Sequence, residues 1–269
     1  MKILLLYFTG TGCTGKFAAE LKKGFEQLKG TVDLIRIKRG LQVDLSEYNL
    51  VGIGAPAYSF RAPRIATKFI RKLDFQNKPI FVFCTSGGMP GNTLWNLYRA
   101  ANRTSNICLG YIDAAGVTNL RSWMAPISEA KSNLRGLSSY DLSTIFRFTQ
   151  EIVKRLKLQK TEAKKQNKNW IPAHSFGTII WSLFFTWRWQ MLFTVGIKRV
   201  DKSKCTSCQL CATKICPSGS ISMKKNETPQ FNEFLCVGCN GCVNLCPEDA
   251  IWTLQTRNHQ QYNLSLIHI

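Results

Sequence analysis

The chain has 269 residues, of which 45% are hydrophobic, and a formal net charge of +20 at pH 7, so it is long enough for one well-cored domain and a smaller second one. Residues 1–150 hold 20 basic and 9 acidic side chains, residues 151–204 hold 12 and 3, and residues 205–269 hold 4 and 4. The basic excess predicts an acidic redox protein or an anionic membrane face as partner, or else a solvated surface that binds nothing; no basic-aromatic module or zinc finger accompanies it, so nucleic acid is not expected.

A phosphate-binding loop is predicted near the N-terminus. Ile3–Phe8 is a continuous apolar run, typical of a strand buried on both faces, and it leads into Thr9-Gly10-Thr11-Gly12-Cys13-Thr14. A helix is expected to follow over about residues 14–29. Glycines let backbone amides face an anion, threonine hydroxyls add donors, and the helix supplies its positive end.

The same residues also match the dinucleotide fingerprint, as Gly10-x-Gly12-x-x-Gly15. That interpretation requires an acidic residue at the end of the second strand. The strand expected at Val32–Ile37 ends instead in Lys38-Arg39. NAD is therefore disfavoured, whereas this test leaves NADP open.

Two more loops are expected at the same edge of a parallel sheet. Ala55–Pro63 follows a strand at Leu50–Gly54, and Thr85–Gly91 follows a strand at Pro79–Cys84; each loop opens a helix, the first of them reaching about Leu73. Loops that follow parallel strands meet where doubly wound folds bind ligands. The remaining expected elements are a fifth strand at Ile107–Ala115, a functional insertion at Val117–Ser139 and a last helix from about Leu142 to Leu158.

The string from Thr9 to Thr14 resembles the phosphate loop of flavodoxins, (Ser/Thr)-x-Thr-Gly-x-Thr. This resemblance implies an α/β, flavodoxin-like doubly wound parallel sheet of order 2-1-3-4-5, with the FMN phosphate in the first loop and the isoalloxazine ring between the other two. It also implies Tyr58 as the residue that stacks on the flavin, with an ordinary loop aromatic as the alternative, whereas Trp95 is expected to pack. The FMN-binding residues implied by the resemblance are Thr9, Gly10, Thr11, Gly12, Cys13, Thr14, Pro56, Ala57, Tyr58, Ser59, Phe60, Thr85, Ser86, Gly87, Gly88 and Gly91.

An unusual linker follows the first domain. Lys154–Lys168 is lysine-rich, and Phe176–Ile197 is apolar and aromatic with Arg188 as its single formal charge. The apolar segment is long enough to span a bilayer, but Arg188 near its centre would cost about 2.5–3.5 kcal/mol. We expect the segment to pack between the domains, or to lie in a membrane interface with help from Lys198 and its basic neighbours; a true span is the third interpretation. His174, just before it, is expected to be packed or solvated.

Eight of the eleven cysteines lie after residue 204, in two runs. They are Cys205-x2-Cys208-x2-Cys211-x4-Cys216-Pro217 and Cys236-x2-Cys239-x2-Cys242-x3-Cys246-Pro247. Three cysteines two residues apart wrap a tight turn that puts three thiolates on one corner of a cube, so the fourth ligand must come from elsewhere. A zinc ribbon would use two CxxC pairs, and disulfides fit poorly with a chain that lacks a secretory signal. The remaining cysteines, Cys13, Cys84 and Cys108, are expected to serve packing.

Residues 198–253 resemble the bacterial ferredoxins with two 4Fe-4S clusters, in which the last cysteine of each run crosses to the other cluster. The resemblance implies one ligand set of Cys205, Cys208, Cys211 and Cys246, and another of Cys216, Cys236, Cys239 and Cys242. One departure is Ala212–Ile215, which has four residues where the family usually has three. We expect a bulge that still delivers the Cys216 thiolate, while a ligand change or a shifted potential at that cluster stays open.

Together the parts resemble a family of flavodoxin–ferredoxin fusion proteins found among anaerobic microbes. The expected divisions are an FMN-binding domain (1–160), a linker (161–197), a ferredoxin domain (198–256) and a tail (257–269) whose last residues resemble translated sequencing adapter. The implied function is anaerobic electron transfer between FMN and two 4Fe-4S clusters, and since no proton-transfer constellation stands out, a carrier is favoured. The alternatives are a flavin-dependent oxidoreductase acting on a quinone, a porphyrinogen or NAD(P)H, and a redox-sensing or interaction module. Reduced thiolates and the lack of a secretory signal predict a cytoplasmic location, at most peripheral at the inner membrane face.

Overall fold

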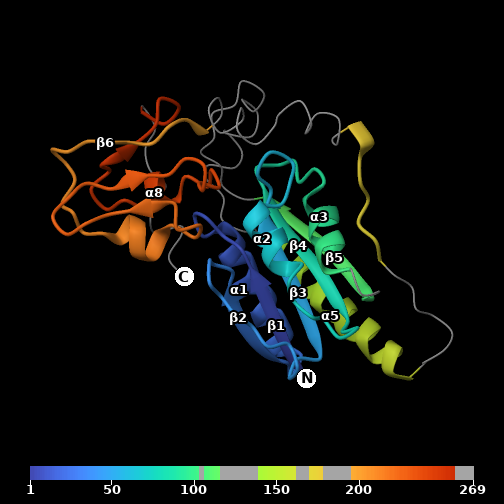
Figure 1. Cartoon of the computed structure of the whole chain (residues 1–269). Helices are drawn as coiled ribbons and strands as arrows, with labels where there is room; N and C mark the ends of the chain where they lie inside the picture. Colours follow the sequence, from blue (N-terminus) through green and yellow to red (C-terminus); the bar gives the residue numbers. More distant parts are fainter. Residues whose placement is uncertain (103–105, 116–138, 162–169, 178–194, 258–269) are drawn as a thin grey trace.

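The computed structural model describes residues 1–102, 106–115, 139–161, 170–177 and 195–257 (Figure 1). Its first region, residues 1–177, is built on a five-stranded parallel sheet of order β2-β1-β3-β4-β5, which confirms the predicted flavodoxin-like topology. The strands are β1 (Lys2–Tyr7), β2 (Thr31–Arg36), β3 (Leu50–Pro56), β4 (Ile80–Ser86) and β5 (Cys108–Ala115). The helices are α1 (Cys13–Gln27), α2 (Arg64–Ile70), α3 (Thr93–Ala101) and α5 (Ser139–Thr161).

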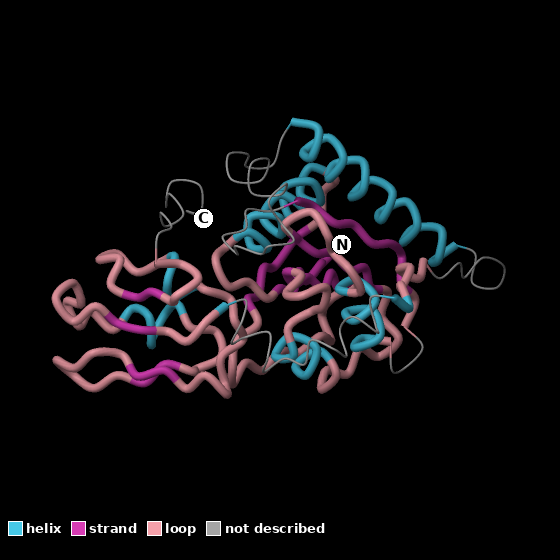
Figure 2. Tube along the Cα trace, turned by 90° about the horizontal axis from the view of Figure 1, so that it is seen from above, coloured by secondary structure: helices cyan, strands magenta, loops and turns pink. Residues whose placement is uncertain are grey.

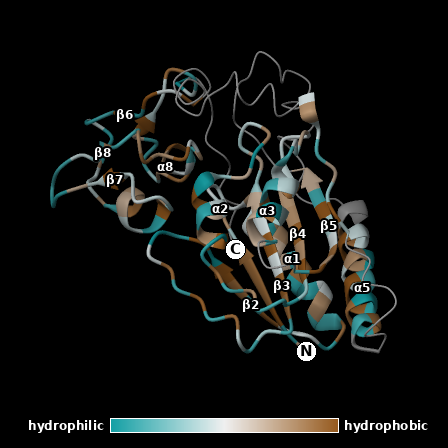
Figure 3. Cartoon of the chain, turned by 45° about the vertical axis from the view of Figure 1, so that its right-hand side comes forward, coloured by the Kyte–Doolittle hydropathy of each residue, from teal (hydrophilic) through white to brown (hydrophobic). Residues whose placement is uncertain are grey.

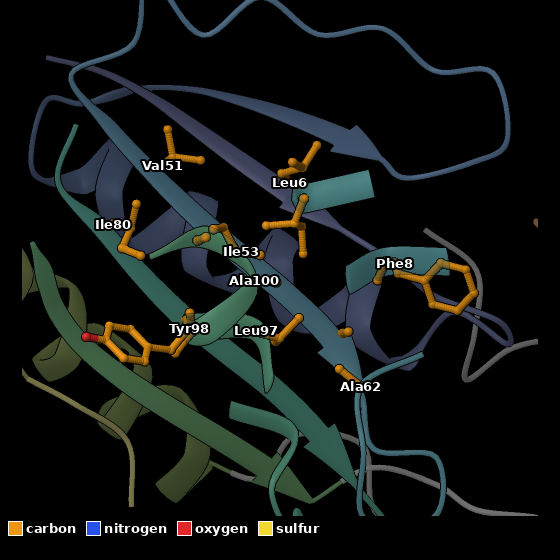
Figure 4. Close-up of a cluster of buried hydrophobic side chains, with 14 of the residues drawn as sticks. Leu6, Phe8, Val51, Ile53, Ala62, Ile80, Leu97, Tyr98 and Ala100 are labelled. Carbon is orange, nitrogen blue, oxygen red and sulfur yellow. The ribbon is translucent and has the colours of Figure 1, made fainter. Parts of the chain in front are cut away.

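Helices cover both faces of this sheet (Figures 1 and 2). Successive side chains of a strand point to opposite faces, so Leu4 and Leu6 of β1 pack with α2 and α3, whereas Ile3 and Leu5 pack with α1 and α5. Figure 4 shows the first of these two layers, in which Leu97 of α3 faces the strand residues. The central strands β1, β3 and β4 are correspondingly rich in hydrophobic residues (Figure 3). The continuous apolar runs of the sequence are therefore explained by burial on both sides.

Most element bounds lie within a few residues of those predicted from the sequence. The main difference is that β3 continues to Pro56 and β4 to Ser86, because Pro56 pairs with Thr85 at the edge where loops were expected. α5 is also longer than predicted at both ends. The predicted insertion at Val117–Ser139 lies outside the described residues except for its last residue, with which α5 begins.

The second region, residues 195–257, contains two short antiparallel strand pairs and two short helical turns. β6 (Arg199–Val200) pairs with β9 (Ile251–Trp252), and β7 (Ile221–Ser222) pairs with β8 (Gln230–Phe231). A π-helical turn, η2, spans Cys211–Ile215, and α8 spans Gly241–Asn244. Three cysteines, Cys211, Cys242 and Cys246, belong to the buried core of this region. The ferredoxin-like pattern thus forms a small unit whose interior is made partly of sulfur.

Residues 170–177 form a strap that runs from the amino end of β5 to the loop that follows the carboxyl end of β4. At its start, the Trp170 amide donates to the Cys108 carbonyl (2.9 Å) and the Arg155 guanidinium lies 3.6 Å from the Trp170 ring centre. Near its end, the Asn92 side chain donates to the Ser175 carbonyl (3.1 Å) and accepts from the Ser175 amide (2.9 Å). Cys108 begins β5, whereas Asn92 follows the carboxyl end of β4. The strap therefore carries the chain toward the carboxyl ends of the strands (Figure 1).

The strap also accounts for two aromatic residues of the sequence. Trp95 packs, as predicted, and its partner is the exposed His174, whose ring stacks on it with centroids 4.5 Å apart. The linker beyond residue 177 lies outside the described residues up to residue 194, and so does the tail from residue 258. Among the described helices, none has the length and hydropathy needed to cross a bilayer.

Candidate cofactor sites at the carboxyl edge of the sheet

The predicted phosphate loop lies between β1 and α1 and has the geometry of an anion site. Gly12 takes a left-handed conformation (φ 105°), and its amide donates to the Thr9 hydroxyl (3.0 Å). α1 begins at Cys13 without a side-chain cap and without an acidic residue in its first turn. The amides of an uncapped first turn and the positive end of the helix dipole together favour an anion such as a phosphate.

The other two predicted loops are tied to the phosphate loop and to each other. The buried hydroxyls of Thr14 and Thr85 are hydrogen-bonded (2.8 Å), and the Ala57 amide donates to the Thr85 carbonyl (2.7 Å). Farther out, the Asn92 amide donates to the Phe60 carbonyl (2.9 Å). The three loops that the sequence assigns to FMN therefore meet at one edge, held by bonds between residues far apart in the chain.

Tyr58 lies in a tight turn above the phosphate loop. Tyr58 and Arg61 exchange two backbone hydrogen bonds, and Ser59 and Phe60 between them have positive φ values of 54° and 64°. The Tyr58 ring meets Phe8 edge to face, with centroids 6.4 Å apart. Its hydroxyl lies 2.5 Å from the point where a Cβ atom would stand on Gly10. This places Tyr58 at the site edge, and its stacking on a flavin stays a prediction.

The second run contributes three members of a cysteine set that surrounds a cavity in the second region. Cys216, Cys236, Cys239 and Cys242, here called the second cysteine set, line this cavity together with Asn240 and Lys198. Asn240 is 2% exposed, and neither polar atom of its side chain has a hydrogen-bond partner among the described residues. Sulfur atoms of an inserted group would accept a hydrogen bond from the Nδ2 of Asn240, so these residues fit an iron–sulfur cluster.

The other four cysteines also come together across the two runs. Cys205, Cys208, Cys211 and Cys246 form the first cysteine set. Burial raises the pKa of the Cys211 thiol to about 11, and the neighbouring Cys208, Cys246 and Cys205 act in the same direction. Cys208 is exposed, whereas Cys246 is buried. The structure thus brings the last cysteine of each run next to the first three of the other, the crossing that the resemblance implies.

No three His, Cys, Asp or Glu side chains of the described segments lie close enough to share one metal ion. Each set supplies four cysteines, and these thiolates would hold the clusters implied by the motif.

A π-helical turn absorbs the additional residue of the first run. The Cys216 amide donates to the Cys211 carbonyl (3.1 Å), which is the i to i+5 bond of a π-turn. The turn is the expected bulge, and Cys216 reaches the cavity of the second cysteine set. There its sulfur accepts a hydrogen bond from the Ser220 amide (3.3 Å) and is hydrogen-bonded to the Ser220 hydroxyl (3.2 Å). Burial raises the pKa of the Cys216 thiol, but hydrogen bonds from Ser218 and Ser220 outweigh it, so the net pKa is lowered.

Burial dominates at two further members of the second set, Cys239 and Cys242. It raises the pKa of Cys239 to about 12 and that of Cys242 well above its ordinary value. Because cluster ligands are thiolates, assembly must release protons from these buried thiols. The Gly241 amide donates to the Cys239 sulfur (3.5 Å) and the Gly238 amide to the Cys236 sulfur (3.4 Å). Such bonds stabilise the thiolate form.

Lys198 is a charged neighbour of the second set that sequence reasoning placed elsewhere. One of the three interpretations of the linker gave Lys198 a role at a membrane interface, but its side chain is 1% exposed and its ammonium donates to the Glu233 carboxylate (2.9 Å). Burial lowers the pKa of Lys198, yet attraction to Cys236 and Glu233 outweighs it and the net pKa is raised. The physical reason for the correction is that a buried ion pair, far apart in sequence, holds this lysine beside a cysteine.

Comparison with known proteins identifies a domain family in each of the two regions. A flavodoxin domain family matches residues 4–102, and a 4Fe-4S dicluster domain family matches residues 204–251. Dihydromethanopterin reductase (acceptor) of Methanosarcina mazei is 38% identical over 53 residues, which are 19% of this chain and 22% of the relative. Pyruvate synthase subunit PorD of Methanocaldococcus jannaschii is 36% identical over 52 residues, which are 19% of this chain and 59% of the relative.

A third relative is NADH-quinone oxidoreductase subunit I 2 of Geobacter metallireducens, which is 34% identical over 60 residues, 19% of this chain and 45% of the relative. The chain thus matches less than two thirds of the length of each of these relatives. Among solved structures, a flavodoxin from the domain Archaea superposes with a TM-score of 0.45 and 17% identity, covering 58% of this chain and 99% of that one. Flavodoxin 2 from Bacillus cereus gives 0.44 and 15% over the same shares.

Proposed function

Because this chain joins a flavodoxin domain (residues 4–102) to a 4Fe-4S dicluster domain (residues 204–251), we propose that it is a redox carrier that passes electrons between FMN and two 4Fe-4S clusters. A flavin exchanges one or two electrons and each cluster exchanges one, so the pair links two-electron and one-electron donors. Two of the relatives carry names of redox subunits, which agrees with electron transfer.

The observation that carries this proposal is the direct contact between the two candidate sites. Gly10 of the phosphate loop touches Cys239 of the second cysteine set, and Cys239 packs into the same buried cluster as Phe8 and Tyr58. Electron transfer weakens steeply with distance, so a carrier needs its centres close together. A chain that only stored clusters would have no need of this contact.

FMN is proposed as the flavin because the site at β1 fits a terminal phosphate. The uncapped first turn of α1 and the Thr9 hydroxyl surround the place that a phosphate takes in a strand-to-helix loop. Tyr58 and the loop at Thr85–Gly91 would then flank the ring. β2 ends at Arg36 and offers no acidic side chain there for a ribose hydroxyl, which disfavours NAD in its place.

The electron partner is proposed to be an acidic redox protein. The 204 residues before the cysteine runs hold the whole net positive charge of the chain, whereas residues 205–269 are neutral overall. Attraction between such a surface and an acidic protein speeds association at low salt and weakens as salt screens it. A rate of electron delivery that is independent of ionic strength would contradict this partner class.

The proposed function is tested by anaerobic reductive titration of the cluster-reconstituted protein in the presence of FMN. Flavin absorbance and the EPR signals of the clusters are followed in the same samples. We expect one bound FMN and two reducible clusters that equilibrate with it. Clusters without bound FMN would contradict the flavin assignment, and FMN without clusters would contradict the carrier.

A further inference from the structure

The phosphate loop and the second cysteine set meet at two glycines. A methyl group added to Gly10 would overlap the Cβ atom of Cys239 and stand 3.1 Å from its sulfur. From the other side, a methyl group added to Gly241 would stand 3.0 Å from the Gly10 carbonyl oxygen. The backbones of the two regions thus approach each other with no room for a side chain between them.

Neither phosphate binding nor backbone conformation explains the glycine at position 10. In the flavodoxin-like loop pattern, (Ser/Thr)-x-Thr-Gly-x-Thr, Gly10 stands at the first x, where any residue is accepted. Its φ is outside the left-handed region, unlike that of Gly12 at 105°, so a side chain would cause no backbone strain. A side chain at Gly10 is excluded by two contacts, because a Cβ atom there would overlap Cys239 and would stand 2.5 Å from the hydroxyl of Tyr58.

Further contacts fix the same orientation of the second region. The Arg36 guanidinium donates to the Thr9 carbonyl (3.1 Å) of the phosphate loop and to the Ile215 carbonyl (3.3 Å) of the π-turn. The Arg39 amide donates to the Pro217 carbonyl (3.3 Å). Val237 is buried in the hydrophobic cluster of the first region that also contains Phe8.

All of these contacts belong to the second cysteine set or to its neighbours in sequence. Ile215 and Pro217 flank Cys216, Val237 follows Cys236, and Gly241 precedes Cys242. The first cysteine set takes no part in the contacts described above, and its Cys208 is exposed to solvent. The two cluster sites are therefore not equivalent with respect to the first region.

We propose that Gly10 and Gly241 are a docking pair that seats the second cysteine set against the phosphate loop, which makes it the flavin-facing site and leaves the first set as the solvent-facing one. The proposal rests on the proposed function, since it assumes that FMN and two clusters bind. It adds the order in which electrons would pass between the sites: from the flavin site to the second set, then to the first set and to the external partner, or the reverse.

The test uses the phosphorus NMR signal of bound FMN in the full chain. In fully reduced protein the flavin is diamagnetic and the clusters are paramagnetic, so a nearby cluster broadens the phosphate line. We expect broadening on reduction of the unaltered protein, because the phosphate loop touches Cys239. Gly10→Ala and Gly241→Ala should lose part or all of it, with FMN at saturating concentration so that altered affinity does not enter the readout.

Gly24→Ala is the matched control for an added methyl group. Gly24 is also tightly packed, since a Cβ there would stand 2.8 Å from the Thr149 hydroxyl, but the contact lies between α1 and α5. This variant should keep the broadening of the unaltered protein. Equal broadening in Gly10→Ala and Gly24→Ala would overturn the docking pair.

Two cysteine variants assign the flavin-facing set. Cys208→Ser, which removes a ligand of the first set, should keep the broadening, and Cys236→Ser, in the second set, should abolish it. The reverse result would overturn the proposed order. The iron and FMN contents of the unaltered protein distinguish failure of the proposed function from failure of the docking proposal. Missing FMN or missing iron would refute the proposed function. If both are present but the phosphate line is not broadened, only the docking proposal is refuted.

Discussion

The first region buries large hydrocarbon side chains, such as Phe17, Phe81 and Phe83, between its sheet and helices, with exposures of 1% or less. In the second region, cysteines occupy three of the core positions, beside small or medium side chains such as Val243 and Ala250. Burial of apolar surface is enough to hold a domain of the first kind together. The second region has strands of two residues and little such surface, so we infer that its stability comes mainly from the groups that its thiolates bind.

Removal of iron should have the largest effect on the difference in stability between the two regions. Chelation under anaerobic conditions should unfold residues 199–256 and leave the sheet of the first region in place, because only the second region depends on sulfur ligands for its core. Hydrogen exchange measured by mass spectrometry would show protection lost from β6 to β9 and kept from β1 to β5. Retained protection in the second region without iron would refute the inferred dependence.

A core truncation in the first region should have the next largest effect. Phe83 is fully buried and meets Phe17 edge to face, with centroids 5.7 Å apart. Phe83→Ala should lower the free energy of unfolding of the first region by about 3–5 kcal/mol and leave the iron content unchanged. Denaturant titration followed by hydrogen exchange in β1–β5 measures it.

The matched control for that truncation lies in the second region. Phe234 is 78% exposed, so Phe234→Ala should change stability by no more than about 0.5 kcal/mol. A similar loss of unfolding free energy in Phe83→Ala and Phe234→Ala would contradict the view that hydrocarbon burial stabilises the first region more than the second.

Lys198 offers a smaller and more specific test within the second region. Its buried ammonium stands near Cys236 and stabilises the added negative charge of a reduced cluster. Lys198→Met should lower the reduction potential of the second-set cluster by tens of millivolts, where about 59 mV corresponds to a tenfold change for one electron. Potentiometric titration by EPR detects it, and the exposed Lys202→Met should leave both potentials in place. A rise in potential in Lys198→Met would contradict the electrostatic role.

The smallest expected effect concerns alkaline pH in the first region. Burial and then the hydrogen bond to Asp33 (2.9 Å) raise the pKa of Tyr48 to about 12. A folded pKa above the unfolded value of about 10 means that the fold favours the protonated phenol of Tyr48. The stabilisation that the protonated phenol gives to the fold is therefore complete below pH 10 and is lost as pH rises toward 12. Tyr48→Phe should therefore remove the part of the alkaline loss of unfolding free energy that comes from ionisation of Tyr48. Identical pH profiles of unfolding for the two proteins between pH 9 and 12 would exclude it.

The topology of the first region is readable from local patterns. Runs such as Ile3–Phe8 are apolar because the strands are covered on both faces, and the loop from Thr9 to Thr14 carries its own signature. In the second region, cysteine spacing predicts which residues gather, and the π-turn at Cys211–Ile215 agrees with the bulge expected from one extra residue. Both kinds of signal lie within a few residues of sequence.

What the sequence does not reveal depends on distant pairs. From the sequence alone, Lys198 is indistinguishable from a surface lysine, and only the structure places Glu233 beside it. In the same way, Asn240 is indistinguishable from an ordinary turn residue, and only the structure shows that it lines the cavity. Gly10 reads as part of a phosphate loop, because its neighbour Cys239 is 229 positions away in the chain. No local periodicity records such contacts, since they arise when two separately patterned regions come together.

The π-helical turn has a consequence for how related chains are compared. A rule that demanded three residues between the third and fourth cysteines would pass over the run that begins at Cys205, although Cys216 lies at the same cavity as its three partners. The π-turn accommodates one more peptide unit within a single helical turn and still brings Cys216 to the cavity. A search for such runs should therefore accept either three or four residues between the third and fourth cysteines.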